Sequence, residues 1–127
     1  MNNSGWKFFT PSRHKVSKYE GRIVVIVSAR GKTKMMYFNE MTIERLGKPK
    51  RVVLATRGSN VAIMPTTVEG DGYALQRPDK GGTPFCACSA FVKEFNLQDG
   101  VYDAHVETNG GGGNMIVFDM QDTPSRR

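Results

Sequence analysis

Residues 39–64 constrain the fold of this chain more than any other stretch, because they combine the signals of a short helix with those of a hairpin. Asn39 is a good N-cap, since its side-chain oxygen can accept hydrogen bonds from the free amides of a first helical turn. Gly47 suits the left-handed position just past a helix end, and Pro49 prevents the helix from continuing. Two β-branched runs then flank the turn 57–60. The predicted unit is a strand, a short helix and a hairpin, at residues 34–38, 39–47, 52–56 and 61–64.

The same order of elements recurs 49 residues later. A short strand at 85–88 precedes a helix at 90–95, with Ser89 as the N-cap and Asn96 as the left-handed exit residue. A degenerate internal duplication explains this order economically, and a chance recurrence of common elements is the alternative. The matched positions are Leu46 with Phe95, Ile43 with Val92 and Val52 with Val101, and the second hairpin has strands at 101–107 and 114–120.

The remaining segments complete a single domain. We predict a strand at 22–29 that is central and buried on both faces, because its apolar run is continuous. Residues 65–84 are rich in glycine and proline and predict a connector with a brief strand at 73–76. The predicted fold class is mainly β with two short helices (α+β), as a small pseudo-symmetric β-barrel built from two strand–helix–hairpin repeats. The predicted limits are a basic, aromatic arm at 1–21, one globular domain at 22–122 with repeats at about 32–66 and 83–120, and a tail at 123–127.

The composition is that of an ordinary folded domain. A length of 127 residues suffices for one hydrophobic core, and hydrophobic and charged contents of 39% and 24% are typical of globular proteins. The longest aliphatic run covers only residues 23–27, whereas a membrane-spanning helix needs about 20 apolar residues. The first residues lack the apolar stretch of a secretory signal. We therefore expect a cytoplasmic protein without membrane contact.

The net charge of +6 is unevenly distributed along the chain. Residues 1–66 hold 13 lysines and arginines against 3 acids, whereas residues 67–127 hold 5 against 9. A strongly basic half predicts an anionic partner, and a merely solvated surface is the alternative. Cations that displace counterions from DNA give affinity with little sequence information, and about six neutralised phosphates predict a salt slope near −5. We expect one continuous DNA-binding face formed by Arg30, Lys32, Lys34, Arg45, Lys48, Lys50, Arg51 and Arg57.

The repeated unit resembles the swapped-hairpin unit of AbrB-type DNA-binding proteins. The resemblance lies in residues 34–38, in Ile43-Glu44-Arg45-Leu46-Gly47, and in the strands 52–54 and 61–64. It implies two interlocked copies that form a small barrel and bind DNA, as in a regulator or a nucleoid-type protein. Since both copies lie in one chain, it implies a monomeric pseudo-dimer or a homodimer. The paired arginines on the helix of that family are not reproduced here, because their places fall near Ile43 and Glu44. The second copy also lacks the basic exit loop, so a basic face from one copy alone would give one-sided, phosphate-dominated contact.

No catalytic or metal-binding constellation is evident, so we expect no enzymatic activity, no cofactor and no metal site. His14 and His105, placed in the arm and on a strand, offer no Ser-His-Asp or Cys-His arrangement. Cys86 and Cys88 are not a Cys-x-x-Cys pair, and no second pair completes a zinc site. We expect two reduced, largely buried thiols. The acids of the second half match no calcium-binding loop.

Two alternatives remain open for the partner. A protein-binding module, such as an antitoxin or an inhibitor of a host factor, would use the acidic second half. These residues do not distinguish RNA from DNA as the ligand, because a small β-barrel with a basic face can bind either. In the arm, Trp6, Phe8 and Phe9 could stack on bases or pin the terminus onto the core.

Overall fold

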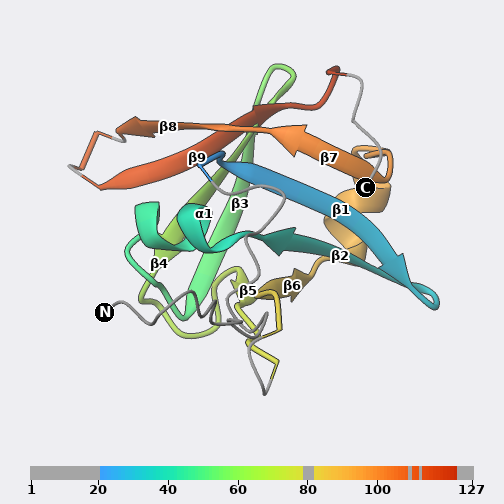
Figure 1. The fold of residues 1–127 in the computed structure, drawn as a ribbon, viewed down its shortest axis with the longest axis horizontal. Coiled ribbons are helices and arrows are strands. Elements are labelled where there is room, and N and C mark those ends of the chain that lie inside the picture. The colour runs from blue at the N-terminus through green and yellow to red at the C-terminus, as the bar shows by residue number, and fades with distance from the viewer. Residues whose placement is uncertain (1–20, 79–81, 109, 112, 123–127) are drawn as a thin grey trace, which may run out of the picture.

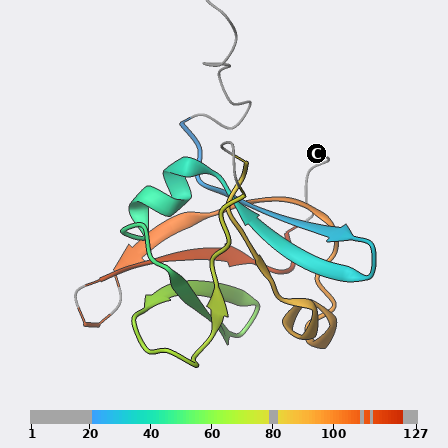
Figure 2. The same ribbon diagram turned by 90° about the horizontal axis from the view of Figure 1, so that it is seen from below.

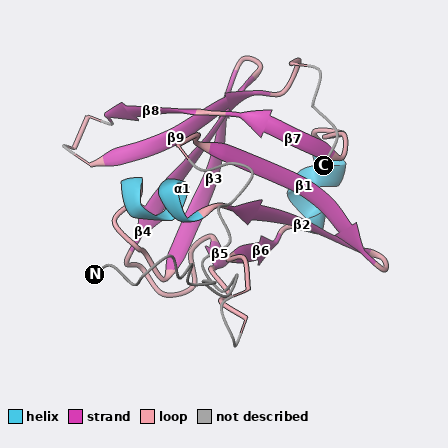
Figure 3. Ribbon diagram, viewed as in Figure 1, coloured by secondary structure: helices cyan, strands magenta, loops and turns pink. Residues whose placement is uncertain are grey.

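The computed structural model describes residues 21–78, 82–108, 110–111 and 113–122, and within them the chain is mainly β with two short helices, as predicted. The strands form two antiparallel sheets (Figures 1 and 3). The predicted tail and nearly all of the predicted arm lie outside the described residues. The first sheet has the order β6 (Phe85–Ala87), β2 (Thr33–Phe38), β1 (Val24–Arg30) and β7 (Gly100–Asp103). The second sheet has the order β5 (Tyr73–Ala74), β3 (Arg51–Arg57), β4 (Asn60–Thr66), β9 (Asn114–Asp119) and β8 (His105–Thr108). The two helices are α1 (Glu40–Arg45) and α2 (Ser89–Glu94).

Strand β1 confirms the predicted central strand. It pairs with β2 on one side and with β7 on the other, and its first four residues are all buried. Val25 and Val27 point into the main core, whereas Val24 and Ile26 pack with Val101 on the opposite face. Burial on both faces explains why this strand reads as a continuous apolar run.

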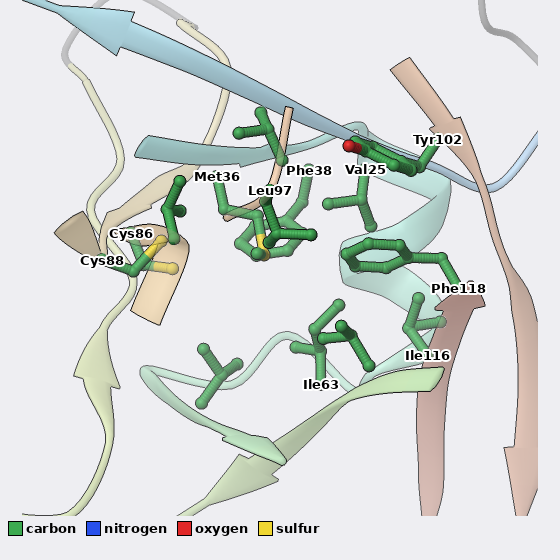
Figure 4. Packing of buried hydrophobic residues seen from close by; sticks show 14 of the residues in the cluster. Val25, Met36, Phe38, Ile63, Cys86, Cys88, Leu97, Tyr102, Ile116 and Phe118 are labelled. Atoms are coloured by element: carbon green, nitrogen blue, oxygen red, sulfur yellow. The ribbon is translucent and has the colours of Figure 1, made fainter. Parts of the chain in front are cut away.

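The main core lies between the two sheets. It joins Val25, Met36 and Phe38 of the first sheet to Ile63 and Phe118 of the second (Figure 4). The rings of Tyr102 and Phe118 contribute a tilted contact between the sheets, with their centroids 4.9 Å apart.

The described strands form two sheets and no closed barrel, so the predicted barrel is not confirmed. The sheets meet at one edge through the backbone pair of Gln76 and Phe85, with N···O distances of 2.8 and 3.0 Å. At the other edge the chain passes from β7 to β8 through Ala104. Because β6 is only three residues long, it offers few backbone groups for a continuous ladder between the sheets.

Both helices end as the sequence predicts. Gly47 has φ 86° and Asn96 has φ 52°, which places each in the left-handed conformation. In α1, the amides of Gly47 and Lys48 donate to the carbonyls of Glu44 and Ile43. The corresponding residues after α2, Asn96 and Leu97, make the same two bonds 49 positions later. This pair of bonds is the Schellman motif, which satisfies carbonyls that have no partner within the helix.

The helix starts differ from the prediction. Asn39 occupies the N-cap position, but its side chain makes no bond to the helix amides. Instead its Nδ2 donates to the carbonyl of Arg22 at 2.7 Å, and its Oδ1 lies 2.5 Å from the buried hydroxyl of Thr42. Ser89 is the first residue of α2, not its N-cap, and its Oγ accepts from the amide of Lys34 at 2.8 Å. Both polar side chains therefore fasten a helix to the first sheet.

The first predicted hairpin is confirmed as β3 and β4. The prediction of the second hairpin is wrong in one respect. The predicted strand 101–107 is divided at Ala104 into β7 and β8, which belong to different sheets. The amide of Ala104 donates to Ile23, outside the ladder that β8 forms with β9. The brief strand predicted at 73–76 is present as β5 and the bridging residue Gln76.

The recurrence of elements at an offset of 49 extends to the three-dimensional arrangement. Helices α1 and α2 match residue for residue at that offset. Equivalent strands pair with each other in antiparallel fashion, β2 with β6 and β4 with β9. Strands related by a two-fold axis must pair in this way, because each contact is then repeated with the roles exchanged. The duplication that would explain this arrangement stays a prediction.

Neither described helix has the length or the apolar character needed to cross a membrane.

Candidate nucleic-acid interface

The eight cations predicted as DNA contacts lie in three separate places. Figures 1 and 2 show the β1–β2 turn and the exit from α1 at opposite ends of the molecule, and Figure 1 shows the β3–β4 turn at a third position. One continuous basic face is therefore not found. The first place holds Arg30, Lys32 and Lys34, the second Arg45, Lys48, Lys50 and Arg51, and the third Arg57.

Two of these cations form ion pairs with acids of the second half. The Nζ of Lys34 lies 3.2 Å from Oδ1 of Asp99, and a guanidinium nitrogen of Arg57 lies 3.8 Å from Oε1 of Glu107. Lys34 also holds α2 through its backbone, because its carbonyl accepts from the amide of Cys88. These cations act first as links between the basic and acidic halves. Sequence reasoning missed the pairs because the partners lie 65 and 50 residues away.

The exit from α1 is where predicted cations converge on a concave feature. Lys48, Lys50 and Arg51 line a groove of about 870 Å³. The end of β4 and the loop that follows also line it, with Thr66 directly paired to Arg51 and with Thr67 and Glu69 beyond, while Leu46, Pro49, Pro65 and Ala74 supply apolar surface. The three cations were predicted from the sequence, whereas Thr66, Thr67 and Glu69 were not. The glycine- and proline-rich segment 65–84 was the signal that a loop follows β4.

The path of the chain after α1 exposes the lysines. Gly47 and Lys48 both have positive φ, 86° and 54°, so the backbone reverses direction within two residues. The amide of Lys48 donates to Ile43, and the carbonyl of Lys50 accepts from Leu75 at 2.8 Å. The backbone of the exit is thus fixed at both ends. The side chains of Lys48 and Lys50 are exposed, and neither forms an ion pair with any described residue.

Arg51, which lines the groove, forms two hydrogen bonds to the loop before β5. Its Nε donates to the carbonyl of Asp71 at 2.9 Å, and its Nη2 donates to the carbonyl of Gly72 at 3.2 Å. Gly72 has φ 63° and lies so close to β3 that a Cβ there would be 2.1 Å from the carbonyl oxygen of Val52. The loop before β5 is therefore held against β3. Arg51, half-buried, is committed to this role rather than free for a ligand.

The groove has an excess of positive charge. Among the described residues that line it, Glu69 supplies the single carboxylate against three cations. Arg45, exposed at the last position of α1, adds a further cation next to the exit. Its carbonyl accepts from Nδ2 of Asn114 at 3.1 Å, which ties the helix end to β9. An anion is the class of ligand that this arrangement favours.

The groups considered for catalysis are engaged elsewhere. Cys86 and Cys88 are free and buried, and Figure 4 shows their sulfur atoms next to each other in the core. The hydrogen bond with Cys88, together with burial, raises the pKa of the Cys86 thiol, so its reactive thiolate is disfavoured. His105 is exposed, with its Nε2 2.6 Å from Glu107. No group of three metal-ligating side chains occurs within the described part of the chain, and His14 lies outside it.

Comparisons with protein-family models, with curated proteins and with solved structures find no match to this chain. The AbrB-type resemblance is therefore still a prediction from the sequence.

Proposed function

We propose that this chain is a non-enzymatic DNA-binding protein that contacts phosphates through the cations at the exit from α1. The observation that carries the proposal is the pair of exposed lysines, Lys48 and Lys50, that share one concave surface without an internal carboxylate partner. A cation without such a partner binds a phosphate without first breaking an ion pair. Lys34 and Arg57 would each first have to break an ion pair, with Asp99 and Glu107 respectively, so they contribute less to phosphate binding.

The proposed contact is smaller than the one expected from the sequence. Arg45, Lys48 and Lys50 together neutralise about three phosphates, which gives a slope of log affinity against log salt near −3. Contacts of this kind position the protein on the backbone and carry little sequence information. The proposal is accordingly a regulator or nucleoid-type protein with weak or shape-based preference, acting in the cytoplasm.

The finer architecture belongs to the same proposal. We infer a pseudo-symmetric barrel of AbrB type, closed through the backbone pair of Gln76 and Phe85 and through Ala104 between β7 and β8. The pairing of β2 with β6 and of β4 with β9 within one chain supports a monomeric pseudo-dimer.

The test is a fluorescence anisotropy titration of the full chain with two DNA duplexes of unrelated sequence, between about 50 and 200 mM salt. Similar affinities for both duplexes, with a slope near −3, are expected. Lys48→Glu with Lys50→Glu should weaken binding to both and reduce the slope by about 2.

The matched comparison is Arg30→Glu with Lys32→Glu, which changes the net charge equally at the other end of the molecule. This pair should cost far less affinity. Equal losses from the two double variants would refute the α1 exit as the interface, and an affinity independent of salt would refute phosphate binding itself.

No observation favours the protein-binding alternative. Asp99, Asp103 and Glu107 of the acidic half are paired with Lys34, Arg22 and Arg57 of the same chain. These pairs reduce the charge that a basic partner would find.

A further inference from the structure

We propose that the groove at the exit from α1 takes unpaired nucleotides of a single strand, in preference to the outside of a duplex. This inference rests on the proposed function and names the form of nucleic acid that the same site binds. It stands on three features of the groove: the apolar part of its lining, its size, and the lysines, hydroxyls and single carboxylate among the residues that line it.

Part of the lining of the groove is apolar. Pro49, Pro65 and Ala74 contribute to it together with Leu46, which is 4% exposed. Backbone phosphates gain nothing from such surface, whereas the flat face of a base can pack against it and leave water. In a duplex the base faces are already stacked on one another, so only an unpaired base can use this apolar surface.

The size of the groove suits a small unit of a nucleic acid. Its volume of about 870 Å³ falls within the range of about 300–1,000 Å³ found for pockets that enclose small-molecule ligands. One or two nucleotides are ligands of that size, whereas a duplex is far larger than this volume.

The lining of the groove combines polar groups of different charge. Lys48 and Lys50 line it together with Thr66, Thr67 and Glu69. A single strand in the groove can direct its phosphates to the lysines and its base edges to the hydroxyls and the carboxylate. There the hydroxyls can donate or accept, and the carboxylate accepts from an exocyclic amino group. A duplex backbone across the groove would instead place phosphates near the carboxylate of Glu69.

The experiment compares a mixed-sequence single-stranded DNA, its duplex and the RNA strand of the same sequence, each titrated into the full chain at one salt concentration. We expect a single strand to bind about tenfold more tightly than the duplex, since apolar packing of the base faces adds to the phosphate contacts. Tighter binding of either single strand than of the duplex supports the inference, and the tighter of the two single strands identifies the sugar. A duplex that binds as tightly as both single strands overturns it.

A substitution can separate the contribution of the apolar lining to affinity from that of the charged side chains. Ala74→Leu fills the groove without changing any charge, and Ala29→Leu makes the same change at an exposed position of β1. Ala74→Leu should reduce single-strand affinity about tenfold and leave duplex affinity nearly unchanged, and Ala29→Leu should change neither. If Ala74→Leu leaves single-strand binding intact, this inference fails while the proposed function stands. If none of the three probes binds, the proposed function fails as well.

Discussion

The Nε of Arg51 donates a 2.9 Å hydrogen bond to the backbone carbonyl of Asp71, twenty residues further along the chain. One side chain at the start of β3 thereby holds the loop before β5. A residue that the sequence suggests as a phosphate contact is thus a positioning residue.

Arg51→Ala should destabilise the fold by roughly 1–2 kcal/mol, because two hydrogen bonds from a charged, half-buried donor are lost. Urea unfolding measures this loss. The loop before β5 should also become susceptible to limited proteolysis. Arg57→Ala is the control, since its exposed ion pair at 3.8 Å is worth well below about 1 kcal/mol. Equal costs for the two variants would contradict the role assigned to Arg51.

Gly72→Ala should destabilise the protein by about 2–4 kcal/mol. Its positive φ strains any side chain, and the added Cβ would collide with the carbonyl of Val52. Gly58→Ala has a nearly identical φ of 61° but meets no atom within 4 Å, so it should cost only about 1 kcal/mol. The difference between the free energies of unfolding of the two variants isolates the cost of the contact between a side chain at position 72 and the carbonyl of Val52. A difference near zero would mean that the loop is not held against β3.

Thr42→Val should cost about 1–3 kcal/mol although it preserves the shape of a fully buried side chain. The single hydroxyl proton can be donated to the carbonyl of Val24 at 3.1 Å or to Oδ1 of Asn39 at 2.5 Å, and valine removes this donor from a buried site. Thr56→Val, at an exposed position of β3, should stay within about 0.5 kcal/mol of the unaltered chain. Thermal or urea unfolding of both variants checks the prediction.

Stability should fall at alkaline pH through Tyr102. Burial raises the pKa of its phenol above the ordinary value of 10.0, and the nearby Asp99 acts in the same direction. Because the folded chain holds this proton more tightly than the unfolded chain, the contribution is full below pH 10 and is lost as the pH rises above it. Tyr102→Phe should flatten this part of the profile in urea unfolding between neutral pH and pH 11. An unchanged slope would exclude Tyr102 as the cause.

Much of the local structure can be predicted from short stretches of this chain. The ends of α1 and α2 follow from Gly47 and Asn96, because glycine and asparagine adopt the left-handed conformation at a helix end more readily than other residues do. The central position of β1 follows from its unbroken apolar run, and the first hairpin follows from β-branched runs around a turn. These features depend on residues that are close in the chain and on the spacing of apolar side chains. Both can be read directly from the sequence.

The candidate site was predictable only in part. The lysines of the α1 exit could be named, because a cluster of cations beside a helix end is visible in a linear chain. The sequence did not predict that Thr66, Thr67 and Glu69 line the same groove. Nor did it predict that Lys34 pairs with Asp99, or that Asn39 bonds to Arg22 instead of capping the helix. Each of these depends on groups that are distant in sequence and meet only after the sheets have packed. Backbone preferences act over a few residues, whereas the partner of a charge or a polar atom is chosen by the whole fold.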